Sequence, residues 1–289
     1  MENTPKPKSE DRLLVLKRIE ELEKEGKFDI DVEDDPETRP LKPGEVDFLR
    51  KKLSSKIKTW FAFKRAKKFL NQIIENKVLI IDDIIGIENI DSLNSGAVMT
   101  LNHFNAFDSF AAEIIYRNSI QFKKKKRHFY RIIWEGNYTS FPGFYGSLMR
   151  NCRTLPLSKN PEVLKEFMRA TNTLLKQGEI VLIYPEQSMW WNYRKPKPLQ
   201  KGAFSFAAKN NVPVLPCFIT MRDTDQIGDD GFPIQAYTLH VAKPIYPDNN
   251  LSVNENINML RDKNYQIWKD IYEDFYKIPL KYLCDEKED

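Results

Sequence analysis

The chain has 289 residues, of which 41% are hydrophobic and 12% aromatic. This is enough apolar material for one large domain or two small ones with a sizeable core, and it excludes a wholly disordered protein. The formal net charge is only +4, from 45 basic and 41 acidic residues, so the overall charge favours no particular partner. Charge is instead sorted into patches along the chain.

The cysteines and the N-terminus indicate a compartment. Cys152, Cys217 and Cys284 are scattered without metal-binding or redox spacing, and their odd number argues against a disulfide framework. The first residues, MENTPKPKSEDR, lack the apolar core of a signal peptide, and no apolar run reaches the ~18 residues that a membrane-spanning helix needs. We therefore expect a cytoplasmic protein that lies peripherally on the inner face of a membrane rather than spanning it.

Residues 1–47 are expected to form an acidic N-terminal appendage and linker. Residues 9–27 place leucines and isoleucines at roughly helical spacing among charges. The following sequence, FDIDVEDDPETRPLKPGE, predicts an acidic linker that contains prolines.

Residues 48–76 form a basic, aromatic segment. Between Lys51 and Ile74 there are eight lysines or arginines and no acidic residue. This composition is typical of a helix in a lipid interface, so we expect a helical membrane-docking segment that faces an anionic surface. Its apolar residues lie on two rotated faces, which fits either two short helices that meet near Phe63 or one broad apolar surface surrounded by lysines. A helix packed on the main domain is the alternative.

From residue 77 to residue 289, short apolar runs alternate with helical patterns. AVMTL precedes a helix from about Ala106, EIVLIYP precedes KGAFSFAAKN, and a final amphipathic helix runs through about Tyr276. Strands that alternate with helices predict an α/β domain with a mixed, largely parallel sheet flanked by helices. In such sheets the active site gathers in loops beyond the carboxyl ends of the strands.

The first polar motif, LNHFNAFDSF, directly follows the predicted strand AVMTL. It places His103 at the carboxyl end of the strand and Asp108 about one turn into the next helix. A carboxylate there can accept a hydrogen bond from one imidazole nitrogen, which fixes the tautomer and leaves the other nitrogen free as a base. A histidine five residues before an aspartate also arises often by chance, so the spacing alone does not identify a catalytic pair.

Two further motifs follow. In VLIYPEQSMWWNYRKPKPLQKG, Pro185 ends a strand and places Glu186 at its mouth, where the carboxylate can bind hydroxyls or the partner cation of a phosphate site. The alternative is an ordinary surface loop with a solvated glutamate. The run VPVLPCFIT carries prolines at 213 and 216, and two prolines cannot both serve a central ladder, so it predicts the start of a strand or a pocket wall.

Taken together and in this order, the motifs resemble the signature blocks of the glycerolipid acyltransferase family, which includes the 1-acylglycerol-3-phosphate acyltransferases. The first block of that family is Asn-His-x4-Asp, and its counterparts are Asn102, His103 and Asp108. The third block is an aromatic residue, Pro, Glu, Gly, then Ser or Thr, and it is matched by residues 184–186 and Ser188. The resemblance covers roughly residues 84–246.

Other parts of the family pattern are matched less evenly. Gln187 replaces the glycine of the third block, and Met189 stands where an arginine often follows. Residues 212–216 reproduce the Val-Pro-aliphatic-aliphatic-Pro run of the fourth block. Lys201 and Gly202 resemble the Lys-x-Gly element that opens the intervening helix.

The second block, normally a glycine and a basic residue, is blurred. FPGFYGSLMRNCRTLPLSK lies in the right place, and Arg153 is the best candidate for its acceptor-binding cation, with Arg150 and Lys159 as rivals. In the family, cations of the second and third blocks receive the acceptor phosphate, and a methionine cannot make such a charge-assisted bond.

The longer third-block loop leaves two alternatives open. One is that a loop cation replaces the missing arginine; the candidates are Arg194, Lys195 and Lys197. The other is that the acceptor lacks a phosphate monoester, with Trp190 and Trp191 facing the acyl chain or the interface.

The resemblance implies an O-acyltransferase of phospholipid biosynthesis. It would move a fatty acyl group from acyl-CoA or acyl carrier protein to a hydroxyl of a glycerolipid precursor such as 1-acylglycerol 3-phosphate. His103 would remove the hydroxyl proton, Asp108 would hold the imidazolium, and main-chain amides near His103 would stabilise the oxyanion. The substrate-binding residues it implies are Asn102, Arg153, Glu186, Ser188, Lys201 and Gly202. The partners are the thioester donor, a lysolipid acceptor and an anionic membrane surface, and no cofactor is expected.

The remaining features carry weaker expectations. Lys123 to Arg127 are five consecutive basic residues that can contact anionic lipid heads, the phosphates of coenzyme A, or only solvent. No recognisable nucleic-acid module accompanies them, so we expect no nucleic-acid partner. His128 and His240 lie in strand-like runs without further ligands at metal spacing, so we expect structural roles and no metal site.

Two other functions use the same residues. A hydrolase would use His103 to activate water on a thioester or ester, and the sequence does not separate it from a transferase. A catalytically idle, membrane-binding relative would keep the fold; the intact His103 and Asp108 count against it, and the altered third block counts for it.

Overall fold

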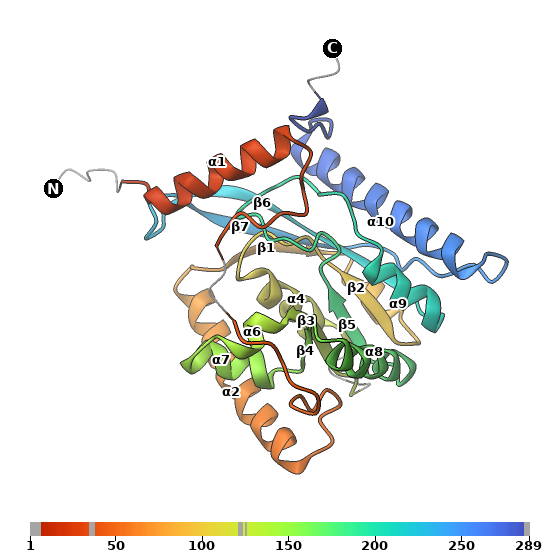
Figure 1. The fold of residues 1–289 in the computed structure, drawn as a ribbon. Helices are drawn as coiled ribbons and strands as arrows, with labels where there is room; N and C mark the ends of the chain where they lie inside the picture. The colour runs from red at the N-terminus through yellow and green to blue at the C-terminus, as the bar shows by residue number, and fades with distance from the viewer. Residues whose placement is uncertain (1–6, 35–37, 121–123, 125, 286–289) are drawn as a thin grey trace.

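A seven-stranded sheet forms the centre of the molecule (Figure 1). The computed structural model describes residues 7–34, 38–120, 124 and 126–285. Neighbouring strands follow the order β1-β7-β6-β2-β5-β3-β4. Strands β6, β2, β5, β3 and β4 run parallel to their neighbours in that group, β7 is antiparallel to β6, and β1 is parallel to β7. The predicted mixed, largely parallel sheet is confirmed. The strands are β1 (Ile80–Ile85), β2 (Ala97–Thr100), β3 (Phe129–Trp134), β4 (Thr154–Leu157), β5 (Ile180–Ile183), β6 (Val214–Ile227) and β7 (Pro233–Val241).

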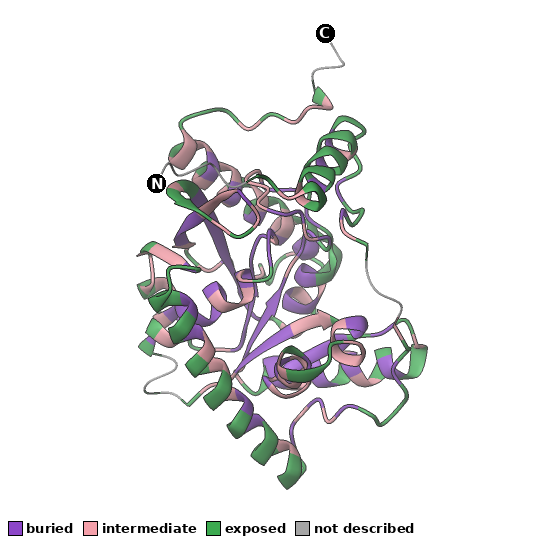
Figure 2. Cartoon of the chain, turned by 90° about the vertical axis from the view of Figure 1, so that its left-hand side faces the viewer, coloured by how far each residue is buried: buried purple, intermediate pink, exposed green. Residues whose placement is uncertain are grey.

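Helices cover both faces of the sheet, and an apolar core separates each layer from it. Helices α8, α9 and α10 pack on one face, and α2 and α4 pack on the other. Alternate strand residues enter alternate cores: Val98 and Val181 point to the first, Met99 and Leu182 to the second. Figure 2 shows buried strands between helices whose outer sides are exposed. The helices are α1 (Glu10–Lys24), α2 (Leu53–Glu75), α3 (Glu88–Asp91), α4 (Asp108–Asn118), α6 (Glu135–Thr139), α7 (Gly143–Asn151), α8 (Pro161–Lys176), α9 (Gly202–Asn210) and α10 (Val253–Tyr276).

The carboxyl ends of β2 and β5 meet at the centre of the sheet. All four residues of each strand are buried, as expected for apolar strands covered on both faces. Thr100 pairs with Ile183 at the last position of the shared ladder. His103 and Glu186 therefore each lie three residues beyond the same rung of the sheet, which brings the first and third motifs together.

The two prolines of the fourth motif mark the start of β6. Pro213 precedes the strand, and its carbonyl accepts from the Val98 amide. Pro216 lies within β6, but the ladder between β6 and β7 begins only at Cys217. The missing amide of Pro216 therefore falls before that ladder, which is how a strand with neighbours on both sides tolerates this proline.

The basic, aromatic segment forms one continuous helix, α2, and not two short helices. Its inner side packs on the domain and against α7; the buried residues are Thr59, Ala62, Leu70 and Ile73. Its outer side leaves large apolar side chains exposed: Leu53, Ile57, Trp60 and Phe61. Among the described residues, no helix combines the length and hydropathy that crossing a membrane requires.

The acidic segment that precedes α2 packs onto the domain although it has little regular structure. Phe28 and Val32 are buried against the two loop tryptophans, while Leu41 and Phe48 join the core beneath α8. The amide of Leu41 donates to the buried carboxylate of Glu135 at 2.9 Å. Residues 28–34 and 38–48 therefore contribute to the same packed structure as the strands.

Candidate active site

The first motif turns the chain sharply from β2 into α4. His103 lies in the loop between them, and Asp108 is the first residue of α4. Nδ1 of His103 lies 2.5 Å from Oδ2 of Asp108. The Asp108 side chain is only 2% exposed, whereas that of His103 is 24% exposed. The geometry thus joins a buried carboxylate to an imidazole that reaches the surface.

Tyr184, which follows β5, contacts both His103 and Asp108. We call these three residues the first-block corner. The Tyr184 hydroxyl donates to Oδ1 of Asp108 at 2.8 Å, and its ring stacks on the His103 ring with centroids 4.2 Å apart. Burial, reinforced by the Asp108 charge, raises the pKa of Tyr184 well above its ordinary value, so the phenol stays protonated and donating. The sequence marked Tyr184 only as the aromatic residue of the third block; its contact with Asp108 depends on the register of β2 and β5.

The second ring nitrogen of His103 has no hydrogen-bond partner among the described residues. Nδ1 is held by Asp108, and no group of the described residues bonds to Nε2. The main-chain amide of Phe104 also donates to Oδ2 of Asp108, at 3.3 Å. The Asp108 side chain therefore fixes the orientation of the His103 ring, an arrangement in which the other ring nitrogen can act as a base.

Asn102 has a different role from the substrate binding that the resemblance implied. Its side-chain amide donates to the carbonyl of Ile219 at 3.0 Å, and its oxygen accepts from the Ile219 amide at 2.8 Å. The side chain is buried and pairs with the β6 main chain as a further rung of the sheet would. Asn102 therefore fixes the loop that carries His103, with its side-chain nitrogen and oxygen both bonded to the β6 main chain.

The Glu186 carboxylate also accepts hydrogen bonds from main-chain amides of the protein. Its Oε2 accepts from the His103 amide at 2.9 Å, and its Oε1 accepts from the Lys197 amide at 2.8 Å. The residue is 3% exposed, and burial raises its pKa. The amide of Trp190 donates to the His103 carbonyl at 3.2 Å. Both main-chain groups of His103 are thus held by the third-block loop.

Ser188 and Lys197 are buried within this loop and not presented to solvent. The Ser188 hydroxyl donates to the Phe28 carbonyl at 2.8 Å, and the Lys197 ammonium donates to the Ser188 carbonyl and hydroxyl at 2.6 and 2.8 Å. Burial lowers the pKa of Lys197 to about 8. The expectation that Ser188 binds substrate is therefore not supported, because its hydroxyl is already bonded within the protein.

Trp190 and Trp191 do not face an acyl chain or an interface. Trp190 is fully buried, stacks on Phe28 with centroids 5.7 Å apart, and donates from its indole to the Ile30 carbonyl. Trp191 is 8% exposed and packs on Phe232. The segment 28–32, part of the predicted linker, covers this loop, and no local sequence pattern indicates that contact.

The cations of the third-block loop are also paired with groups of the protein. Arg194 bonds to Asp223 at 2.7 Å, and Lys195 bonds to Glu23 at 2.5 Å. Together with the buried Lys197, these are the three residues that were candidates to replace the missing arginine. Each of them has a partner within the protein.

Gln187 occupies a backbone conformation that favours glycine. Its φ is +66°, in the left-handed region that side chains with a Cβ rarely adopt. The family's glycine at this position thus has a conformational reason. Here the turn keeps its shape with a glutamine, held by the Gln187 amide, which donates to the Tyr184 carbonyl.

The direction of β4 separates the three cations considered for the second block. Arg153 immediately precedes this strand, at its amino end, and its guanidinium lies over the Phe63 ring of α2. Lys159 follows the carboxyl end of β4, at the edge of the parallel strands where His103 lies. Arg150 is bonded to the carbonyls of Tyr138 and Phe141. Of the three, Lys159 is the exposed cation at the catalytic edge.

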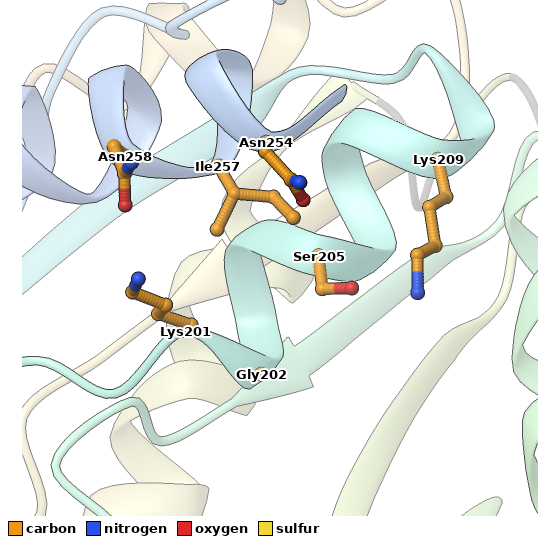
Figure 3. A pocket seen from close by; sticks show the side chains of 7 residues that line it. All are labelled: Lys201, Gly202, Ser205, Lys209, Asn254, Ile257 and Asn258. Carbon is orange, nitrogen blue, oxygen red and sulfur yellow. The ribbon is translucent and has the colours of Figure 1, made fainter. Parts of the chain in front are cut away.

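Lys201 and Gly202 line a cavity of about 360 Å³ between α9 and the start of α10 (Figure 3). Gly202 is the first residue of α9, as the sequence predicts.

Four of the main-chain amides near His103 have partners within the protein. Those of His103 and Phe104 bind carboxylates, and those of Phe107 and Asp108 bind the side chain and carbonyl of Asn105. The oxyanion role is therefore not supported for these four groups.

The other histidines have partners away from this corner. Nδ1 of His128 lies 2.9 Å from Oε1 of Glu179, and Nε2 of His240 lies 2.9 Å from Oγ1 of Thr220. Burial lowers the pKa of His240 to about 4. The predicted lipid or coenzyme A contacts of the basic run 123–127 fall partly outside the described residues, since these include neither residue 123 nor residue 125.

Comparisons with known proteins agree with this fold. Residues 83–220 match the acyltransferase family model. A chloroplastic 1-acyl-sn-glycerol-3-phosphate acyltransferase, BAT2 of Brassica napus, is 28% identical over 169 residues, which are 57% of this chain and 45% of that protein. The chain thus spans less than half the length of this curated relative. In fold it resembles the 1-acyl-sn-glycerophosphate acyltransferase PlsC of Thermotoga maritima, with a TM-score of 0.54, 20% identity, and coverage of 81% of this chain and 87% of that one.

Proposed function

We propose that the protein transfers a fatty acyl group from an acyl thioester to a hydroxyl of a glycerolipid precursor. The observation that carries this proposal is the buried Asp108 carboxylate bonded to Nδ1 of a partly exposed His103. The acyltransferase-family domain over residues 83–220 supports the choice of acyl transfer among reactions that need a base. In this proposal His103 is the general base, Asp108 its partner, and Tyr184 the group that positions Asp108.

The reaction needs no covalent enzyme intermediate. Nε2 of His103 accepts the proton of the acceptor hydroxyl while that oxygen bonds to the thioester carbonyl carbon. The tetrahedral adduct then breaks its carbon–sulfur bond, and the departing thiolate takes the proton from the imidazolium. The products are an ester and a free thiol, and Asp108 stays ionised throughout, holding the ring by charge and hydrogen bond.

The proposed acceptor depends on which cations are available to bind a phosphate. A lysophosphatidate-like acceptor, 1-acylglycerol 3-phosphate, fits if Lys159 receives its phosphate from the end of β4. A second candidate is a lysolipid without a phosphate monoester. This candidate is favoured by Met189 at the arginine position and by the internal partners of Arg194 and Lys197.

The test is a product analysis with acyl-CoA and acyl carrier protein donors against lysophosphatidate, other lysophospholipids and glycerol 3-phosphate. We expect acyl transfer to at least one lysolipid and its loss in His103→Ala. Acyl release at a rate that no acceptor changes would identify a hydrolase instead. Transfer retained in His103→Ala would remove this residue as the base.

Peripheral membrane docking through α2 is part of the same proposal. The outer side of α2 exposes Trp60 and Phe61 by 55% and 56% among its lysines. Beside it, Phe69, Phe144 and Arg65 line a cavity of about 320 Å³ between α2 and α7. Exposed aromatic side chains next to basic ones are the combination that binds an anionic lipid surface. The proposed location is the inner leaflet of the membrane, which faces the cytoplasm.

Vesicle sedimentation of the full chain tests the docking. Since burying each large apolar side chain contributes about 1.5–3 kcal/mol, changing both Trp60 and Phe61 to Ser should weaken binding to anionic vesicles by about 10²-fold or more. Leu14→Ser is the matched control, because Leu14 is 60% exposed on α1. Equal binding of all three proteins would exclude α2 as the docking surface.

A further inference from the structure

Three arginines gather near the amino end of β4, at the opposite end of the parallel strands from His103. Arg50 precedes α2, Arg150 lies in the last turn of α7, and Arg153 immediately precedes β4. The Arg50 guanidinium donates to the Arg150 carbonyl at 2.8 Å, and the Arg153 guanidinium lies 4.9 Å from the centre of the Phe63 ring of α2. The arginines therefore meet where α2 and α7 pack side by side (Figure 1).

Arg50 is a buried cation whose hydrogen bonds are incomplete. The residue is 8% exposed, and its Nε has no hydrogen-bond partner among the described residues. Burial lowers the pKa of Arg50, and the charge of Asp47 opposes this only from beyond ion-pair distance. The Asp47 oxygens instead accept from the amides of Lys51 and Lys52, at 3.0 and 2.9 Å. A buried guanidinium in this setting is stabilised by an anion that binds its remaining donors.

The other two arginines bring further positive charge without an ion pair. Arg150 donates to the carbonyls of Tyr138 and Phe141, at 3.2 and 3.1 Å. Arg153 packs on the Phe63 ring. In the part of the chain that the structure describes, neither guanidinium lies within ion-pair distance of a carboxylate. Neighbouring charges of one sign repel each other, so an anion between them lowers the energy of all three.

Tyr130 of β3 places a neutral hydroxyl beside two of these cations. Burial raises the pKa of Tyr130, and the charges of Arg153 and Arg50 oppose that rise without cancelling it. Glu179 is the acidic residue that acts on the same phenol, and it is bonded to the ring and the amide of His128. The phenol therefore stays protonated at neutral pH. Guanidinium groups beside a hydroxyl are a donor set that suits the oxygens of a phosphate group.

The backbone at two of the arginines gives an independent indication that their side chains are needed. The φ angle is +52° at Arg50 and +54° at Arg153, in the left-handed region that favours glycine. Arg153 lies just past the end of α7, where glycine is the residue that commonly takes this conformation. Residues in sparsely populated backbone conformations cluster at functional sites, which fits a binding role for these two side chains.

We propose that Arg50, Arg150 and Arg153 form a binding site for a phosphate group, with the Tyr130 hydroxyl as a further donor. The site lies at the amino end of β4 and is therefore separate from the catalytic edge. Two sources carry this chemistry: free phosphate, and the head group of an anionic phospholipid at the surface on which α2 is proposed to dock. Only the lipid source rests on that docking, and neither source rests on acyl transfer.

The test measures the melting temperature of the full chain with inorganic phosphate and with chloride at equal ionic strength. A ligand that binds only the folded chain raises the melting temperature. We expect phosphate to raise it in wild type and to raise it less in Arg50→Met and Arg153→Gln, because loss of one charge-assisted hydrogen bond weakens binding about tenfold. Comparing each variant with and without phosphate separates binding from any change in intrinsic stability. If Arg50→Met does not fold, the less buried Arg153 carries the comparison.

The matched control is Arg261→Gln. Arg261 is paired with Asp262 on α10, and α10 covers the other face of the sheet from α2. This variant should respond to phosphate as wild type does. No rise in wild type, or an equal rise in wild type, Arg50→Met and Arg153→Gln, would overturn the site.

Monomeric dihexanoyl phosphatidylglycerol separates the two sources. Binding to the full chain is measured by calorimetry beside inorganic phosphate. Tighter binding of the lipid that is weakened about tenfold in Arg153→Gln would assign the site to a phospholipid head group. Tighter binding of inorganic phosphate with the same dependence on Arg153 would assign it to free phosphate. Affinities for both ligands that are unchanged in Arg153→Gln would remove the site.

Discussion

The first-block corner (His103, Asp108 and Tyr184) and the third-block loop (residues 186–197) lie side by side but differ in exposure. In the corner, the His103 side chain is 24% exposed above a buried carboxylate. In the loop, Glu186 and Lys197 are buried, and residues 28–32 cover the loop from outside. The corner leaves Nε2 of His103 without a partner among the described residues, whereas Glu186, Ser188 and Lys197 of the loop bond within the protein.

The difference shows that residues from the same group of family motifs can have different structural roles. The loop binds both the amide and the carbonyl of His103, through Glu186 and Trp190. In the proposed mechanism the loop therefore positions the base. Changes in the corner should alter the reaction, and changes in the loop should alter stability first. The predictions that follow test this division, beginning with the largest expected effect.

Removing the base tests the corner directly. We expect His103→Ala to lower the rate of acyl transfer by about 10²–10⁴-fold, the usual contribution of a general base, with little change in the melting temperature. The measurement is initial rate with saturating donor beside a thermal melt. His128→Ala, which removes a histidine bonded to Glu179, should keep its activity. A loss of folding in His103→Ala would place His103 among the structural residues instead.

Removing a buried aromatic ring tests the loop. Trp190→Ala should lower the free energy of unfolding by about 3–5 kcal/mol, because a fully buried indole and its contact with Phe28 are lost. Denaturant titration gives this value. Trp60→Ala, on the exposed side of α2, should change it by only about 0.5 kcal/mol. Similar losses in both variants would contradict the burial of the loop beneath residues 28–32.

The pH dependence of stability tests the buried ammonium of the loop. Burial lowers the pKa of Lys197 to about 8, while an unfolded lysine keeps a pKa near its ordinary value. Above pH 8 the unfolded chain therefore binds more protons, so the free energy of unfolding should rise with pH, on the order of 2 kcal/mol by pH 9.5. Lys197→Met should lack this rise, whereas the surface variant Lys165→Met should keep it. An identical pH profile in wild type and Lys197→Met would contradict the assignment.

Two cations at opposite ends of β4 test which end of that strand lies near the acceptor phosphate. If the acceptor carries a phosphate, Lys159→Ala should raise its KM about tenfold, since a hydrogen bond to a charged group is lost. Arg153→Ala should leave KM unchanged, because Arg153 precedes the strand and contacts Phe63. The comparison uses lysophosphatidate as acceptor. The reverse result would restore Arg153, and no effect of either change would favour an acceptor without a phosphate monoester.

Much of the site was predictable where a motif directly follows a strand. The contact between His103 and Asp108 depends on five residues of local chain, and the start of α9 at Gly202 depends on local helix signals. The cation of the second block could not be assigned from the sequence, for a topological reason. A basic residue before a strand and one after it look alike in sequence, but the strand separates Arg153 from Lys159 and only Lys159 reaches the catalytic edge.

The sequence by itself determined the alternating α/β pattern, the histidine–aspartate spacing and the basic, aromatic composition of α2, because each depends on residues close together in the chain. Only the tertiary structure decided the roles of the remaining motif residues. Asn102 pairs with Ile219, and Ser188 bonds to Phe28, across separations of 117 and 160 residues. Whether such polar groups face a substrate or the protein is decided by burial and by long-range hydrogen bonding, since a buried polar group must find its partner wherever the fold brings one.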